Sequence, residues 1–250
     1  MTIYQHLLEQ SAQGRKMLTV LVDPDKLKNK EVESIAIKAA LSGVDYFFVG
    51  GSLLVNNELD QCIKTLKANS DIPVILFPGN TMQMSWRADA ILFLSLISGR
   101  NAEMLIGRHV IAAPYLRLSP LEVISCGYML IENGKPTAVQ YMSNTMPIPA
   151  DKMDIAICTA MAGEMLGLKM IYLEAGSGAI NPVSKEMVEQ VKQNISIPLL
   201  AGGGLNTPEK TREIALAGAD IIVVGTAFEK NSGLISEIAD AVHSASTFTK

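Results

Sequence analysis

Short apolar runs that alternate with helical patterns constrain the fold of this chain more than any other feature. Eight runs are rich in Val, Ile and Leu: Met17–Val22, Tyr46–Val49, Val74–Phe77, Ala90–Leu94, Val110–Ala113, Met170–Leu173, Pro198–Ala201 and Ile221–Val224. They do not alternate apolar with polar residues, so we expect both faces of each strand to be buried, as in a parallel sheet. Helical patterns lie between most of them: Glu31–Leu41, Asn57–Ala68, Ala150–Leu166, Lys185–Gln193 and Pro208–Ala217. Strand and helix in repetition predict βαβ units.

The length of the chain matches this repetition. Its 250 residues suit one (β/α)8 barrel, and no linker or low-complexity stretch divides them. We therefore predict an α/β protein with a single barrel domain over residues 1–250. Hydrophobic residues make up 48% and charged residues 18%, which excludes a disordered chain. A net charge of −4 with one Trp and six Phe argues against a nucleic-acid surface.

Three stretches depart from the repeat. Residues Gly79–Arg87 have no long helical period, so we predict an irregular segment with at most a short helix. Tyr128–Ile131 and Thr137–Met142 flank an Asn-Gly pair, which predicts a β-hairpin outside the barrel after the fifth strand. Ser244–Lys250 is expected to fray.

The remaining features predict a cytoplasmic protein. The three cysteines are widely spaced and form no CxxC pair, which is typical of reduced thiols. The first 16 residues lack the apolar core of a signal peptide. No apolar run reaches about 18 residues, so no membrane span is predicted. The histidines follow no strand end and receive no catalytic role: His6, His109, His243.

Small or acidic residues follow five of the predicted strands, where a barrel carries its active site. They are Asp23-Pro24-Asp25-Lys26, Gly50-Gly51-Ser52, Glu174–Gly178, Gly202–Gly204 and Gly225-Thr226. Glycines let the backbone approach a phosphate closely, and barrels often bind phosphate after strands seven and eight. Gly202–Gly204 and Gly225-Thr226 therefore predict a phosphate site, with tight turns as the alternative.

Acidic side chains at these ends predict further chemistry. Glu174 would face the barrel mouth as a hydroxyl acceptor or a general base, unless it only caps a helix or forms an ion pair. Asp23 and Ser52 offer the hard oxygen donors that Mg2+ prefers, with a structural turn before Pro24 as the alternative for Asp23.

Five motifs in order resemble geranylgeranylglyceryl phosphate synthase, a family whose superfamily also includes heptaprenylglyceryl phosphate synthase. They are Leu21–Lys26, Val49–Ser52, Tyr172–Gly178, Ala201–Leu205 and Val224–Thr226, and the resemblance extends from residue 17 to residue 230. It implies a modified TIM (β/α)8 barrel in which the helix after strand three is replaced by an irregular segment.

The resemblance also implies roles for single residues. Asp23 and Ser52 would bind Mg2+, and Glu174 would be the catalytic residue beside the glycerol hydroxyls. Met104 would limit the depth of the prenyl site, where the family often has an aromatic residue. The residues implied to hold sn-glycerol 1-phosphate are Tyr172, Leu173, Glu174, Ala175, Gly176, Ser177, Gly178, Gly203, Gly204, Gly225 and Thr226.

The function implied is Mg2+-dependent transfer of a prenyl group from its diphosphate to the terminal hydroxyl of sn-glycerol 1-phosphate. The Tyr-Leu-Glu-Ala-Gly-Ser-Gly run and the Gly-Thr ending are similar to the geranylgeranyl branch. The alternatives are a longer, heptaprenyl-type substrate, another phosphate-binding barrel isomerase or lyase, and a catalytically silent barrel. Relatives of this kind form dimers or hexamers, so we expect a homo-oligomer, with transient contact with a membrane surface.

Overall fold

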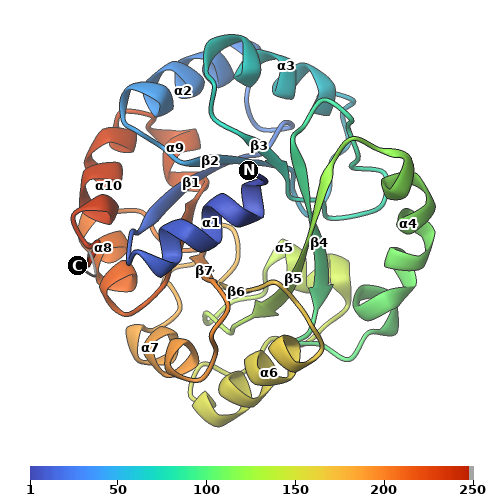
Figure 1. Ribbon diagram of the computed structural model, residues 1–250, viewed down its shortest axis with the longest axis vertical. Helices are drawn as coiled ribbons and strands as arrows, with labels where there is room; N and C mark the ends of the chain where they lie inside the picture. The colour runs from blue at the N-terminus through green and yellow to red at the C-terminus, as the bar shows by residue number, and fades with distance from the viewer. Residues whose placement is uncertain (248–250) are drawn as a thin grey trace.

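The computed structural model describes residues 1–247 and contains a closed barrel of eight parallel strands (Figure 1). The strands are β1 Met17–Val22, β2 Tyr46–Val49, β3 Val74–Leu76, β4 Ala90–Leu96, β5 Glu122–Leu130, β6 Met170–Glu174, β7 Leu199–Gly202 and β8 Ile221–Val224. They pair in chain order, and β8 closes the barrel against β1. The predicted fold class is confirmed.

The helices surround this barrel. They are α1 Ile3–Ala12, α2 Asn29–Leu41, α3 Leu59–Asn69, the π-helix η1 Glu103–Gly107, α4 Arg108–Leu118, α5 Ala138–Ser143, α6 Met153–Met165, α7 Lys185–Gln193, α8 Pro208–Leu216, α9 Thr226–Lys230 and α10 Leu234–His243. The five predicted helices correspond to α2, α3, α6, α7 and α8. Turns and bends occupy Gly79–Arg87 between β3 and β4, so the predicted irregular segment is confirmed (Figure 1).

Alternate residues of each strand face the barrel interior or the helices. In β1, Met17 packs in the interior cluster, whereas Leu18 and Val20 pack in the layer beneath the helices. Helix α1 lies across the N-terminal end of the barrel, where Leu7 joins the interior cluster (Figure 1). The backbone amides of Ile3 and Tyr4 donate to the Glu122 carboxylate at 2.6 and 3.0 Å. The closed N-terminal end leaves the C-terminal end for a site.

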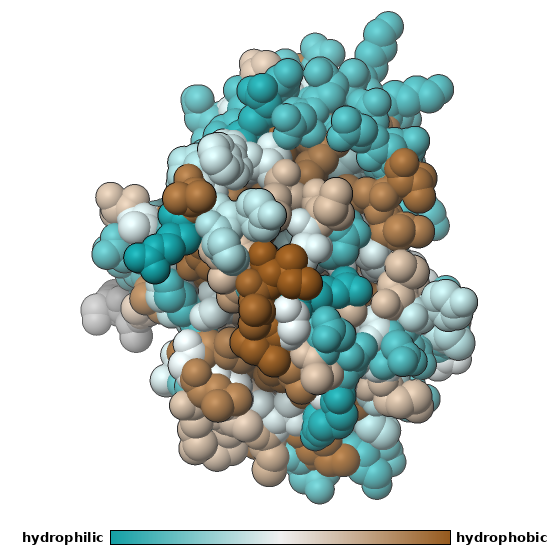
Figure 2. Space-filling view, turned by 90° about the vertical axis from the view of Figure 1, so that its right-hand side faces the viewer, coloured by the Kyte–Doolittle hydropathy of each residue, from teal (hydrophilic) through white to brown (hydrophobic). Residues whose placement is uncertain are grey.

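The prediction of the fifth strand was wrong. Val110–Ala113 lies inside α4, and β5 follows at Glu122–Leu130, paired with β4 over seven residues. The prediction assumed that an apolar run is buried. Here Val110 is 65% and Ile111 58% exposed. Hydrophobic residues gather on this side of the molecule (Figure 2). The true strand contains Ser125, Cys126 and Gly127 and lacks a strong apolar pattern.

Two smaller predictions were also wrong. The predicted hairpin does not form, because Tyr128–Leu130 belongs to β5 and Ala138–Ser143 is the helix α5, capped by the Thr137 side chain. The predicted fraying of the C-terminal segment is not seen as far as Thr247. The backbone amide of Thr247 donates to the Gly14 carbonyl at 3.0 Å. Residues 248–250 lie outside the described part. Among residues 1–247, no helix is long and apolar enough to cross a membrane.

Candidate active site

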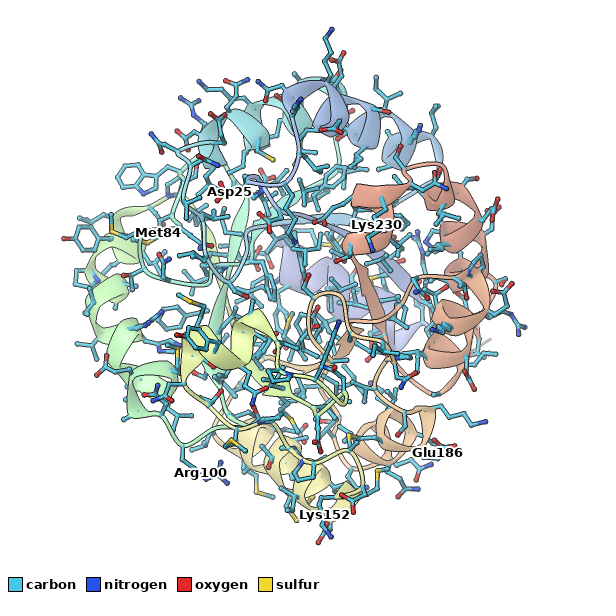
Figure 3. All side chains as sticks on the ribbon, turned by 180° about the vertical axis from the view of Figure 1, so that it is seen from behind. Asp25, Met84, Arg100, Lys152, Glu186 and Lys230 are labelled. Atoms are coloured by element: carbon cyan, nitrogen blue, oxygen red, sulfur yellow. The ribbon has the colours of Figure 1, made fainter. Side chains whose placement is uncertain are left out.

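A cavity of about 400 Å³ opens at the C-terminal end of the barrel. Figure 3 views the molecule from the side opposite to Figure 1, with Lys230 of α9, which lines this cavity, labelled. Most of the predicted site residues line it: Asp23, Ser52, Tyr172, Glu174, Ser177, Gly178, Gly203, Gly204, Gly225 and Thr226. The structure therefore brings both halves of the predicted site together.

Glu174, the last residue of β6, is a buried carboxylate in this cavity. Its side chain accepts a hydrogen bond from the backbone amide of Gly176 at 2.5 Å. Burial raises the pKa of Glu174, and hydrogen bonding offsets part of that rise. A Cβ on Gly203 would lie 2.5 Å from Glu174 Oε1, so the loop after β7 packs directly on the carboxylate. The carboxylate is held at the inner wall of the cavity, where it can accept a proton or a hydrogen bond.

The loops after β6, β7 and β8 converge as predicted. The Ser177 and Thr226 hydroxyl oxygens lie 3.2 Å apart, which joins the first loop to the third. Gly203 and Gly204 have φ values of +82° and +69°, a region that favours glycine. Their backbones lie against the β6 loop, since a Cβ on Gly204 would lie 2.7 Å from the Asn181 carbonyl carbon. Peptide groups and two hydroxyls thus line this part of the cavity, as an anion requires.

The hydroxyl of Tyr172 also faces this region. It is buried beside Glu174, whose carboxyl pKa it lowers, although the two side chains do not meet the geometry of a regular hydrogen bond. Burial raises the pKa of Tyr172 well above its ordinary value, so the hydroxyl stays protonated and can donate. Gly202 leaves room for it, because a Cβ there would lie 2.3 Å from the hydroxyl oxygen. A protonated hydroxyl beside a buried carboxylate places a donor and an acceptor together at this point of the cavity.

Three predicted residues lie in the β6 segment without lining the cavity. The side chains of Leu173 and Ala175 pack in the layer between the sheet and the helices. Gly176 packs against the Thr137 side chain, and Asn133 donates to the Ala175 carbonyl. Contacts from these three residues to a ligand would have to come from peptide groups.

The β1 side of the cavity carries two charged residues to which the sequence analysis gave no role. Lys26 Nζ lies 3.1 Å from Asp23 Oδ2 and 3.6 Å from Glu229 Oε2 of α9. Gly51 lies beside Asp23, since a Cβ there would approach Asp23 Oδ2 to 3.1 Å. The sequence signal was available for Lys26, which completes the Asp-Pro-Asp-Lys run, but Glu229 follows no recognisable motif.

The donors present here fit Mg2+. A carboxylate and a hydroxyl, Asp23 and Ser52, line one cavity and are hard oxygen ligands. Residues 1–247 contain no group of three or more His, Cys, Asp or Glu side chains placed to bind a metal. Mg2+ needs no such group, because it takes one or two protein carboxylates and fills its shell with water and substrate phosphate oxygens.

A second, narrower cavity of about 140 Å³ meets the first one. Gly51, Ser52, Phe77, Tyr128 and Val139 line both. The second cavity is largely apolar and runs between β4 and the η1–α4 segment. Met104 lines it, as the resemblance implies.

An aromatic cluster forms the junction of the two cavities. The ring centroids of Phe77 and Tyr128 lie 6.0 Å apart, and those of Tyr128 and Tyr172 lie 5.3 Å apart. Tyr128 was not predicted as a site residue, because the sequence pattern placed it in a hairpin. His109 lines the apolar cavity with its ring edge-on to Phe93, and burial lowers its pKa, so the ring is neutral there.

Comparison with known proteins identifies the family. The model of the PcrB family matches residues 10–245. The chain belongs to the PcrB family. Geranylgeranylglyceryl phosphate synthase of Chitinophaga pinensis is 52% identical over 248 residues, which cover 99% of this chain and 98% of that protein. The resemblance drawn from five motifs is therefore confirmed.

Solved structures of two archaeal synthases agree with this one. The crystal structure of (S)-3-O-geranylgeranylglyceryl phosphate synthase from Thermoplasma acidophilum, in complex with substrate sn-glycerol-1-phosphate, is 33% identical with a TM-score of 0.92. It covers 98% of this chain and 99% of its own. The wild-type synthase from Thermoplasma volcanium is 35% identical, with a TM-score of 0.92 and full coverage of both chains. These relatives are prenyltransferases by name, and the chain is an enzyme of that class.

Proposed function

We propose that this protein transfers a prenyl group, geranylgeranyl in the first instance, from its diphosphate to the terminal hydroxyl of sn-glycerol 1-phosphate, with Mg2+ required. The observation that carries the proposal is the meeting of two unlike cavities at Ser52. One is apolar and fits an isoprenoid chain; the other is lined by glycine loops, hydroxyls and a buried carboxylate. A substrate with an apolar tail and a charged head would place its reacting carbon at their junction.

The residues of the polar cavity support the acceptor half of the reaction. Peptide groups of the β6, β7 and β8 loops, with the Ser177 and Thr226 hydroxyls, would hold the phosphate. Glu174 would accept a hydrogen bond from the terminal hydroxyl and take its proton as the oxygen attacks the allylic carbon C1. The new C1–O bond to glycerol forms while the C1–O bond to diphosphate breaks, and diphosphate leaves with the bonding electron pair.

The opposite side of the cavity supports the departure of diphosphate. Asp23 and Ser52 would hold Mg2+, whose chemistry there is to neutralise the charge on the leaving group. Lys26 adds a positive charge beside Asp23. Phe77 and Tyr128 line the junction, where aromatic rings would stabilise positive charge on an allylic fragment.

A mass-spectrometric assay tests this proposal. The protein is incubated with sn-glycerol 1-phosphate and a ladder of prenyl diphosphates, with Mg2+ or with a chelator. We expect an ether-linked product only with Mg2+. The longest prenyl chain that reacts measures the depth of the apolar cavity that Met104 lines. A preference for heptaprenyl diphosphate would replace the geranylgeranyl assignment by the longer-chain alternative. Absence of any prenylated glycerol phosphate would contradict the proposal.

We further propose that the enzyme works in the cytoplasm as a homo-oligomer, a dimer or a hexamer. Free thiols at Cys62, Cys126 and Cys158 support a reducing compartment. The exposed apolar face of α4 supports an interface. Transient contact with a membrane surface stays a prediction.

A further inference from the structure

Gln83 is a buried amide in the irregular segment that replaces the helix after β3. Only 4% of the residue is exposed, although it belongs to a stretch without helix or strand. Its side chain lines neither cavity, so it is not placed to touch a substrate. A buried amide must find partners for its donor and acceptor, and those partners show what it holds in place.

The Gln83 amide bonds the loops that follow β2 and β3. Its Nε2 donates to the Gly51 carbonyl at 2.9 Å, and its Oε1 accepts from the Gly79 amide at 3.0 Å. A longer contact of 3.5 Å joins the same Oε1 to the Gly51 amide. One side chain therefore reaches both peptide groups of Gly51, the residue directly before Ser52.

The loop held by Gln83 lies between Asp23 and the β3 loop. A Cβ on Gly51 would lie 3.1 Å from Asp23 Oδ2, and a Cβ on Gly79 would lie 2.3 Å from the Gly51 carbonyl oxygen. The Gly79 carbonyl in turn accepts from Arg108 Nη1 at 3.0 Å. Any movement of the Gly51 peptide would therefore move Ser52 relative to Asp23.

We propose that Gln83 is a positioning residue that fixes Ser52 relative to Asp23 and so sets the affinity for Mg2+ with the diphosphate group. The inference rests on the proposed function. The irregular segment thereby has a function in the site. A regular helix after β3 would not bring the Gln83 amide to Gly51, because the chain has to turn toward the barrel there. The glycerol phosphate half of the site lies on β6, β7 and β8, away from these contacts.

Two substitutions of Gln83 test the inference. Gln83→Asn keeps a neutral amide but shortens the side chain, so that it cannot reach Gly51 and Gly79 together, and Gln83→Met removes the donor and the acceptor at similar volume. Ser85→Ala is the matched control, because Ser85 is buried in the same segment but bonds to Asp60 at 2.5 Å, away from Gly51. Calorimetry with inorganic diphosphate and Mg2+ measures the affinity without turnover, and thermal unfolding reports folding.

Both Gln83 variants should weaken binding of Mg2+ with diphosphate, and raise the KM for prenyl diphosphate, by about tenfold, as expected for an unsatisfied buried carbonyl. The KM for sn-glycerol 1-phosphate should change by less than about twofold, and Ser85→Ala should leave all three values unchanged. Should Gln83→Met fail to fold, Gln83→Asn decides the matter.

Folded Gln83 variants with wild-type diphosphate affinity would overturn the inference and leave the proposed function standing. An equal rise in both KM values would also overturn it, since a general loosening of the barrel explains that result. A wild-type enzyme that binds no diphosphate with Mg2+ and forms no prenylated product would overturn the inference and the proposed function together.

Discussion

Burial of the Glu174 carboxylate costs stability and raises its affinity for a proton, as its proposed role of a base requires. A carboxylate buried at the end of a barrel strand loses hydration, which raises its pKa and disfavours the charged form. The Gly176 backbone amide donates a hydrogen bond to this carboxylate at 2.5 Å, which offsets part of the cost of burying its charged form. A carboxylate whose proton affinity is raised by burial is a better base for an alcohol than an exposed one.

Glu174→Gln should therefore reduce turnover while leaving the fold at least as stable as the wild type at neutral pH. The folded protein binds the Glu174 proton more tightly than the unfolded chain, so the wild type loses stability as the pH rises from 4.5 through the raised pKa. The variant lacks this loss. We expect kcat to fall by about 10²–10⁴-fold.

Calorimetric unfolding at pH 5 and pH 8 measures the stability part. The Tm of Glu174→Gln relative to wild type should be higher at pH 8 than at pH 5, by about 2–4 °C for each kcal/mol relieved. A variant that loses Tm equally at both pH values would show that Glu174 is structural.

Asp23→Asn should lower turnover by about 10²-fold or more, since a lost metal-held leaving-group contact costs several kcal/mol in the barrier. The ion pair with Lys26 disappears as well, but only the Mg2+ response separates the two effects. Activity measured against Mg2+ concentration should show a weaker dependence in the variant. Asp71→Asn, on an exposed acid, is the control. Wild-type rates with an unchanged Mg2+ response would remove Asp23 from the site.

Among the elements, the strand ends were predicted well and the segment between β4 and β6 poorly. Glycines lie at the ends of β6, β7 and β8, which are neighbours in the closed barrel. Strand order alone therefore predicted that these glycines meet. Strand β5 and helix α4 were not separable in the sequence, because Val110 and Ile111 are apolar yet exposed. Tyr128, at the junction of the cavities, was missed because the Asn-Gly pair after it predicted a hairpin.

Contacts between loops also lay beyond sequence reasoning. Lys26 lies near Glu229, and Gln83 near Gly51, because distant segments meet at the barrel rim. The pairing of such residues depends on loop conformation, which no periodic pattern encodes. The carboxyl ends of parallel strands, by contrast, meet in every barrel.

The proposal that the loops after β6, β7 and β8 hold the phosphate is best tested at Thr226. A side chain at Gly204 would meet the Asn181–Pro182 backbone at 2.7 Å and would strain a φ of +69°, so Gly204→Val endangers the fold. Thr226→Val keeps the volume and removes only the hydroxyl. We expect the KM for sn-glycerol 1-phosphate to rise by about 10–100-fold through loss of a hydrogen bond to a charged group. An unchanged KM would exclude the Thr226 hydroxyl from phosphate binding.

At the scale of the whole molecule, helix α4 presents an apolar face to the solvent. Val110, Ile111, Tyr115 and Leu118 of α4 are between 58% and 77% exposed. Figure 2 shows hydrophobic residues gathered on this side. Exposed apolar patches of this kind often mark surfaces at which proteins bind one another.

Light scattering at micromolar concentration should therefore give at least twice the 26.9 kDa of one chain. Ile111→Glu should shift the mass toward one chain, because a charge in an apolar interface is costly. Leu41→Glu, on a residue that is 84% exposed at the end of α2, is the matched control and should leave the mass unchanged. A mass of 26.9 kDa for the wild type would contradict the predicted oligomer.

The origin of the ether oxygen tests the central claim most directly. sn-Glycerol 1-phosphate labelled with ¹⁸O in its terminal hydroxyl is incubated with the enzyme, geranylgeranyl diphosphate and Mg2+, and both products are weighed by mass spectrometry. Attack by that hydroxyl on C1 predicts that fragmentation of the product places the ¹⁸O in the bond to the prenyl chain, and that the released diphosphate contains none. An ¹⁸O that remains in a free hydroxyl of the product, or diphosphate released without any ether, would contradict the account.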